Sequence, residues 1–180
     1  MSENKKKTPS FDKKTKRLCF CALFAAIVCA CTFISIPLPI GYFNLGDAAV
    51  LLGAWSLGPL FGCIAAAVGS ALADVLMGYV IYAPATAIIK ALVALCAYVF
   101  ASTLCRVIKN DRLDVVRRAV SAVIGEAVMV GGYFLYEATV LGYGMGATAS
   151  LVGNTLQGVC GVVLGTLVFT ALKKPLHKIL

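Results

Sequence analysis

Long apolar runs, separated by Pro, Gly and charged residues, dominate the pattern along the chain. A helix needs about 20 mostly apolar residues to cross the hydrocarbon core of a bilayer. On that scale the runs predict six membrane-spanning helices, at residues 18–36, 45–57, 60–77, 84–105, 119–139 and 148–172. The second run is short for a full crossing, so we expect its helix to tilt or to thin the bilayer locally. The pattern therefore predicts an all-α integral membrane protein built as a six-helix bundle.

Polar segments at the two ends of the chain set the expected domain limits. We expect a basic cytoplasmic segment at 1–16, a single membrane domain at 17–173 and a cytoplasmic tail at 174–180. A basic head before an apolar run also resembles a signal peptide. No clear small-x-small cleavage site follows this run, however, and more apolar runs come after it. The first run is therefore interpreted as an uncleaved helix.

The distribution of basic residues predicts the orientation. Of the 16 Lys and Arg residues, seven lie before residue 18, five lie within 106–118 and three follow residue 172. Basic residues in short loops mark the cytoplasmic side of a membrane protein. The connections at 37–44, 78–83 and 140–147 contain no Lys or Arg and are expected outside. Both termini are then cytoplasmic, which requires an even number of spans. The same distribution argues that the +8 net charge does not indicate binding to nucleic acid.

Several kinds of site have no support in the sequence. None of the eight Cys forms a CxxC pair, and the one His is in the tail, so we expect no metal site and interpret the Cys as reduced packing residues. The phosphate-binding loop of ATPases, HExxH and GxSxG are all missing. We therefore expect no enzyme activity and no cofactor, with a membrane hydrolase as the least favoured alternative.

Five charged residues fall inside the predicted spans, where a charge is costly and is usually paired or functional. They are Asp47, Asp74, Lys90, Glu126 and Glu137. At about 1.5 Å per residue, all except Glu126 lie in the outer third of the membrane. Two interpretations are open. In the structural one, Lys90 pairs with one of the carboxylates and Asp47 caps a helix. In the functional one, these residues line a ligand pocket that opens outward.

Aromatic and amide side chains extend this outer cluster. Asn154 and Gln157 lie about two turns into the last span, at about 1.5 Å per residue. Aromatic residues gather at the same level, namely Tyr42, Phe43, Tyr79, Tyr82, Tyr133, Phe134, Tyr136 and Tyr143. Interfacial Tyr is common in membrane proteins, but with the polar cluster these rings could enclose a flat heterocycle. Several carboxylates against one Lys favour a neutral or weakly cationic ligand.

Small residues at four-residue spacing form two strips. The first span carries Ala22, Ala26 and Ala30, and the third carries a similar strip over 62–70. Such strips allow another helix to pack closely. Each could pack within this protein, but two strips in one small chain suggest that one contacts a partner.

An ordered set of short motifs resembles the substrate-binding S component of energy-coupling factor (ECF) vitamin transporters, in the riboflavin-type branch. The motifs are Asn44-Leu-Gly-Asp47, Gly58-Pro59, Gly69-Ser-Ala-Leu-Ala-Asp74, Gly78-Tyr79, Ala83-Pro84, Ile89-Lys90, Gly131-Gly-Tyr133 and Asn154-Thr-Leu-Gln157. The resemblance covers roughly residues 18–172. It implies a six-helix bundle that captures a vitamin or precursor of the riboflavin, pyridoxine or hydroxymethylpyrimidine class from outside.

The resemblance also implies partners and a site. The partners are a transmembrane coupling protein, contacted by Ala22, Ala26 and Ala30, and two cytoplasmic ATPases. The binding site would use the first outer loop and the outer parts of the fourth to sixth helices. Its expected ligand-binding residues are Asn44, Tyr79, Lys90, Tyr133, Glu137, Asn154 and Gln157. Asp47 and Asp74 are expected to hold Lys90 and the helix ends. The alternative is a self-contained secondary transporter or channel, in which Glu126 couples transport to protons.

Overall fold

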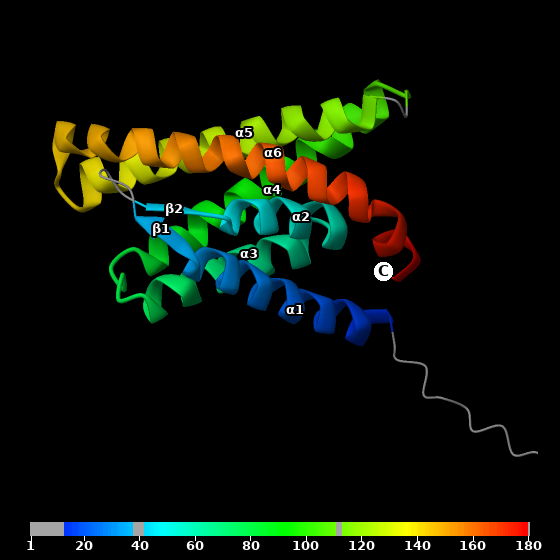
Figure 1. The fold of residues 1–180 in the computed structure, drawn as a ribbon, viewed down its shortest axis with the longest axis horizontal. Helices are drawn as coiled ribbons and strands as arrows, with labels where there is room; N and C mark the ends of the chain where they lie inside the picture. Colours follow the sequence, from blue (N-terminus) through cyan, green and yellow to red (C-terminus); the bar gives the residue numbers. More distant parts are fainter. Residues whose placement is uncertain (1–12, 38–41, 111–112, 180) are drawn as a thin grey trace, which may run out of the picture.

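The computed structural model describes residues 13–37, 42–110 and 113–179, which form six α-helices and a short hairpin (Figure 1). The helices are α1 Lys13–Phe33, α2 Gly46–Leu57, α3 Pro59–Leu76, α4 Ala83–Val107, α5 Asp114–Leu135 and α6 Thr148–Ile179. Five of them, all except α2, are long and apolar enough to cross a membrane. The predicted six-helix membrane architecture is thus confirmed.

The short helix α2 lies inside the bundle. Its 12 residues rise about 18 Å, well short of the roughly 30 Å hydrocarbon core. Ten of the 12 are buried, because α2 packs against α1, α3, α4 and α6. A sequence that is apolar on all sides fits this central position. Neighbouring helices therefore cover the short helix on most of its surface.

The connections and helix ends differ in detail from the sequence-based limits. Two short strands, β1 Ser35–Pro37 and β2 Tyr42–Asn44, lie at the two ends of the predicted outer loop 37–44. They pair as an antiparallel hairpin in which Ser35 lies opposite Asn44. A π-helical turn, η2 Tyr136–Val140, and a 3-10 turn, η3 Gly144–Ala147, connect α5 to α6. Helix α6 continues to Ile179, through most of the expected tail. Hydropathy could not predict this extension, because the added turns are polar.

A polar clamp joins helix ends at the end of the bundle away from the hairpin. Asp114, at the start of α5, lies 3.3 Å from Arg117 and 3.0 Å from Lys173 of α6. The Arg118 guanidinium stacks 4.0 Å from the centre of the Phe169 ring and 5.4 Å from that of Trp55. These contacts tie the start of α5 to α6 and to the end of α2.

The close contact between α1 and α3 depends on Gly69. A Cβ at Gly69 would lie 2.4 Å from the Ala25 carbonyl oxygen and 2.8 Å from the Val28 Cβ. Gly69→Ala is therefore expected to destabilise the bundle by about 1–3 kcal/mol through overpacking, measured as thermal unfolding in detergent. Gly131→Ala is the matched control, because a Cβ at Gly131 of α5 meets no atom within 4 Å. Equal unfolding midpoints for the two variants would contradict this packing.

Candidate ligand-binding site

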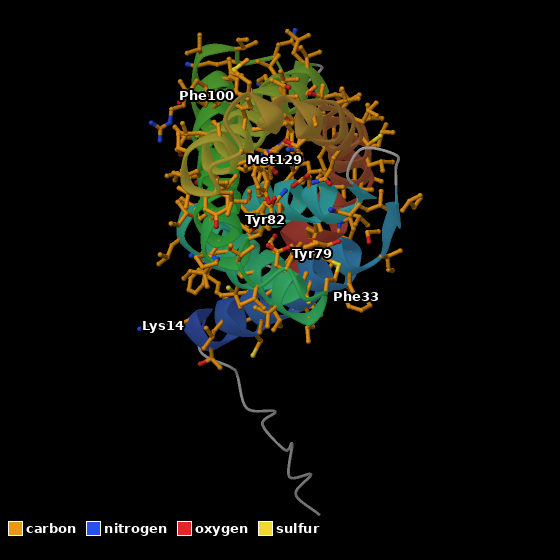
Figure 2. All side chains as sticks on the ribbon, turned by 90° about the vertical axis from the view of Figure 1, so that its left-hand side faces the viewer. Lys14, Phe33, Tyr79, Tyr82, Phe100 and Met129 are labelled. Carbon is orange, nitrogen blue, oxygen red and sulfur yellow. The ribbon has the colours of Figure 1, made fainter. Side chains whose placement is uncertain are left out.

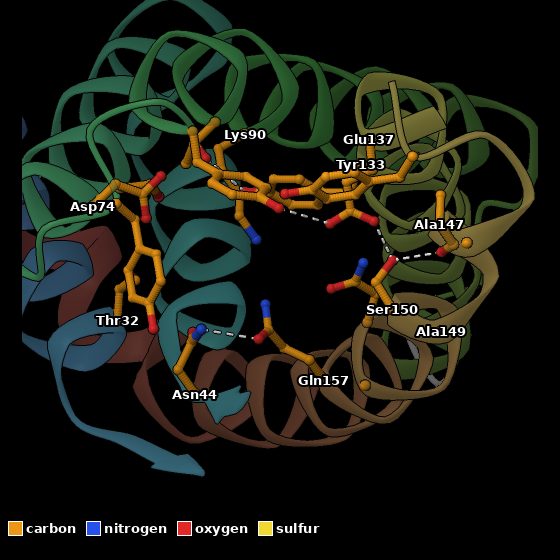
Figure 3. Close-up of a pocket in the computed structure, with 18 residues that line it drawn as sticks. Thr32, Asn44, Asp74, Lys90, Tyr133, Glu137, Ala147, Ala149, Ser150 and Gln157 are labelled. Atoms are coloured by element: carbon orange, nitrogen blue, oxygen red, sulfur yellow. Dashed lines mark hydrogen bonds between the residues drawn. The ribbon is translucent and has the colours of Figure 1, made fainter. Parts of the chain in front are cut away.

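A cavity of about 370 Å³ lies near the end of the bundle that carries the hairpin and the α3–α4 and α5–α6 connections (Figure 3). Figure 2 views the molecule from this end, where Tyr79 and Tyr82 lie. The volume is in the range of small-molecule sites. All seven predicted ligand-binding residues line the cavity: Asn44, Tyr79, Lys90, Tyr133, Glu137, Asn154 and Gln157. Residues separated by more than 100 positions in the sequence thus meet at one site.

A buried polar network forms one part of the cavity wall. Lys90 of α4 forms an ion pair with Asp47 of α2, whose side chain is fully buried. Gln157 Nε2 of α6 donates to the second Asp47 oxygen at 2.6 Å, and Gln157 Oε1 accepts from Asn44 Nδ2 at 2.9 Å. Asn44 Oδ1 in turn accepts from the Gly46 backbone N–H at 2.8 Å. Each amide has a defined orientation as a result, and the network joins β2, α2, α4 and α6.

The structure changes the expected role of Asp47 as a helix cap. Asp47 lies in the first turn of α2, but no side-chain hydrogen bond caps this helix at Leu45. Both Asp47 carboxylate oxygens instead bond to side chains of other helices, Lys90 and Gln157. At the start of α2, the Gly46 backbone N–H instead donates to the Asn44 side chain.

Hydroxyl and aromatic groups form a second part of the wall. The Tyr133 hydroxyl donates to the Thr86 hydroxyl at 3.0 Å, which joins α5 to α4. The Lys90 ammonium lies 5.7 Å from the centre of the Tyr133 ring, within cation–π range. Tyr82 packs edge-on against Tyr79, with ring centres 6.4 Å apart. These rings give the cavity flat apolar faces beside its polar groups.

Glu137 lies in the π-helical turn η2 that follows α5. A π-turn adds a residue to the helical repeat and is frequent at functional sites. The Glu137 carboxylate accepts a hydrogen bond from the Ser150 hydroxyl and one from the Tyr82 hydroxyl at 3.4 Å. Burial, followed by the nearby Glu137 carboxylate, raises the pKa of Tyr82 above its usual range. Tyr82 therefore keeps its proton at neutral pH and remains a donor to Glu137.

Asp74 also lines the cavity, and its surroundings differ from those expected. Among the residues that the structure describes, Lys90 forms its salt bridge with Asp47, and none involves Asp74. Asp74 lies in the last turn of α3, at the C-terminal end of a helix, where the dipole does not favour a carboxylate. It is 3% exposed, and its Oδ2 atom has no hydrogen-bond partner within the described chain. Neither the ion pair nor the cap expected for Asp74 is formed.

Sequence reasoning missed the hydroxyl residues of the cavity. Thr32, Ser70, Thr86 and Ser150 line it but were not among the expected ligand-binding residues. Uncharged Ser and Thr cost little in a membrane helix, so their positions give no signal like that of a buried charge. Glu126 is buried but does not line the cavity, and both of its carboxylate oxygens have no partner among the described residues. It packs against Gly158 and Gly161 of α6.

The two small-residue strips have different surroundings. Ala22, Ala26 and Ala30 are all exposed along α1. The corresponding strip on α3 is buried, and Gly69 beside it packs against α1. The α3 strip therefore packs inside the protein, whereas the α1 strip faces outward from the described bundle.

Membrane-spanning helices around a polar, aromatic cavity define a multi-pass membrane protein with a ligand-sized site. A family model described as "ECF-type riboflavin transporter, S component" matches residues 12–174. The chain belongs to this family of transporter S components, as its motifs suggested.

Two further comparisons agree on the extent of the fold. An uncharacterised Pyrococcus woesei protein, described by its position in a gap 3' region, is 34% identical over 157 residues, covering 86% of this chain and 99% of that protein. A structure reported as the S component of a bacterial ECF transporter is similar with a TM-score of 0.71 and 24% identity, covering 91% of this chain and 99% of that one. The likeness thus extends over a whole S component fold.

Proposed function

We propose that the protein is the substrate-binding S component of an ECF-type ABC transporter and captures a vitamin or vitamin precursor for ATP-driven uptake. The observation that carries this proposal is the convergence of the polar and aromatic residues of β2, α3–α6 and their connections on one cavity. Family membership supports the transport role. The ligand belongs to the riboflavin, pyridoxine or hydroxymethylpyrimidine class.

In this proposal the cavity holds a neutral or weakly cationic heterocycle. Its charged lining residues are Asp74, Lys90 and Glu137, and Asp47 already neutralises Lys90. A strongly anionic ligand would meet the two remaining carboxylates. Lys90, Glu137, Asn154 and Gln157 would hydrogen-bond to the heterocycle, while Tyr79 and Tyr133 would contact its faces.

The basic residues support an outward-facing pocket in a bacterial plasma membrane. Arg106, Arg117, Arg118 and Lys173 lie at the end of the bundle away from the hairpin and the cavity (Figure 1). Basic loops face the cytoplasm in most membrane proteins. With that end and both termini inside, the cavity opens to the exterior, where a vitamin would be captured.

The proposed partners are a transmembrane coupling protein and two cytoplasmic ATPases. The exposed strip of Ala22, Ala26 and Ala30 supports a helix–helix contact along α1, since small side chains allow two backbones to approach closely. Within the described chain this strip has no helix packed on it, whereas the buried α3 strip does.

Reconstitution into liposomes tests this function against a self-contained transporter. We expect riboflavin-class vitamin uptake only when the coupling protein, the ATPases and ATP are present, with no uptake driven by a proton gradient alone. Proton-driven uptake by the isolated protein that is lost in Glu126→Gln would contradict the proposal. It would favour the secondary transporter, which is supported by the Glu126 carboxyl, buried and without a hydrogen-bond partner among the described residues.

A further inference from the structure

Two buried polar atoms without hydrogen-bond partners in the described chain belong to α3 residues that line the cavity. Asp74 Oδ2 and Ser70 Oγ have no hydrogen-bond partner within the described chain, and both residues line the cavity. Asp74 is 3% exposed and Ser70 0% exposed. Residues four apart lie on the same face of a helix, so the two atoms form one small polar surface. Buried polar groups are nearly always hydrogen-bonded, so such a pair needs an explanation.

The protein's own cation and donors are already engaged elsewhere. Lys90 is held by Asp47, and the Tyr82 and Ser150 hydroxyls donate to Glu137. The Thr86 hydroxyl accepts from Tyr133 and neighbours the Asp74 carboxylate. Within the described chain, this leaves Asp74 Oδ2 as an acceptor and the Ser70 hydroxyl as a donor without partners. In Figure 3, Asp74 and Glu137 lie on either side of Lys90, so the two carboxylates are separate features of the lining.

We propose that Asp74 and Ser70 form a specificity-determining surface that binds the edge of a heterocycle carrying an N–H donor beside an acceptor atom. The N–H group donates to Asp74 Oδ2, and the adjacent carbonyl oxygen or ring nitrogen accepts from the Ser70 hydroxyl. A ring imide or an aminopyrimidine has such an edge, whereas an alkyl or phosphate group does not. The inference rests on the proposed binding function but adds α3, which lies outside the elements implied by the family resemblance.

A binding role and a structural role for Asp74 predict opposite effects on the ligand-free protein. If Asp74 recognises a ligand, its buried carboxylate forms no direct salt bridge within the described chain until the ligand binds. Asp74→Asn then leaves the stability of the ligand-free protein unchanged or raises it, as is common where function opposes stability. If Asp74 mainly supports the fold through Thr86, the same substitution lowers the unfolding temperature.

The experiment is calorimetric titration of the purified full chain with riboflavin and, separately, with hydroxymethylpyrimidine, alongside thermal unfolding without ligand. For the probe that the wild type binds, Asp74→Asn is expected to weaken binding about 10- to 100-fold, the range for a lost hydrogen bond to a charged group. Ser70→Ala should weaken it less. Asp114→Asn is the matched control, since this carboxylate lies in the clamp at the other end of the bundle. It should retain wild-type affinity.

The outcomes separate this inference from the function on which it rests. Wild-type binding together with unchanged affinity in Asp74→Asn would overturn the role of α3 alone. A lower unfolding temperature for ligand-free Asp74→Asn would also overturn it, in favour of a structural role. If the folded wild type binds neither probe and no pyridoxine, the proposed vitamin-binding function fails, and this inference fails with it. For riboflavin, the N3-methyl derivative should bind the wild type less tightly, and Asp74→Asn should discriminate less between the two.

Discussion

Asp47→Asn is expected to destabilise the protein by about 3–5 kcal/mol, the range for removing one partner of a buried ion pair. The side chains of Asp47 and Lys90 are 0% and 5% exposed, so the ammonium left behind has little access to water. The substitution also replaces the acceptor that Gln157 uses. Thermal unfolding in detergent should show a large drop in midpoint, and ligand affinity should fall because Lys90 and Gln157 lose their fixed positions.

A double variant distinguishes the charge effect from a general packing defect. Asp47→Asn combined with Lys90→Met removes both charges and keeps similar side-chain volumes. Replacing a whole buried ion pair is often neutral for stability, so we expect the unfolding midpoint to recover most of its loss. Ligand affinity should not recover, because the Lys90 donor is missing. A double variant as unstable as Asp47→Asn would show that the network stabilises by packing instead.

Ala26→Trp is expected to abolish vitamin uptake by the assembled transporter while leaving ligand affinity unchanged. Ala26 is exposed on α1, at the centre of the strip formed with Ala22 and Ala30. An indole there would keep a partner helix from the close approach that small residues allow. Co-purification with the coupling protein and uptake in reconstituted vesicles measure the loss.

The control for this substitution places the same large side chain elsewhere on the surface. Ala127 is exposed on α5, away from the α1 strip. Ala127→Trp should retain complex assembly and uptake. Equal losses in the two variants would indicate that any added bulk on the membrane-facing surface is harmful. Normal assembly of the Ala26→Trp variant with the coupling protein would contradict the proposal that α1 is the partner-binding face.

The sequence predicts the membrane fold well because the energetic signal is strong. Every backbone polar group must be satisfied within the hydrocarbon core, so long apolar runs become helices. The predicted spans at 60–77 and 84–105 differ from α3 and α4 by at most two residues at either end. The position of α2 inside the bundle could not be predicted in this way. Its length predicted a tilted helix or a locally thinned bilayer, and only its contacts with four helices place it at the centre.

The site was predictable where a side chain is energetically costly to place inside a membrane. Charges and amides at one depth pointed to Lys90, Glu137, Asn154 and Gln157, and all four line the cavity. Their partners were not predictable, because the choice among three carboxylates for Lys90 depends on how helices rotate against one another. The π-turn that positions Glu137 also leaves no trace in hydropathy. The hydroxyl groups are evident only once the helices are assembled.

The most direct test of the central claim is mass spectrometry of any small molecule that the purified protein retains, followed by titration with that molecule. We expect one heterocyclic vitamin or precursor, bound in a one-to-one ratio. Ala149→Trp, which adds an indole to the cavity lining, should keep the fold and lose the molecule. A folded wild-type protein that retains no such molecule, and binds none of the riboflavin, pyridoxine or hydroxymethylpyrimidine class, would contradict its assignment as a substrate-binding subunit.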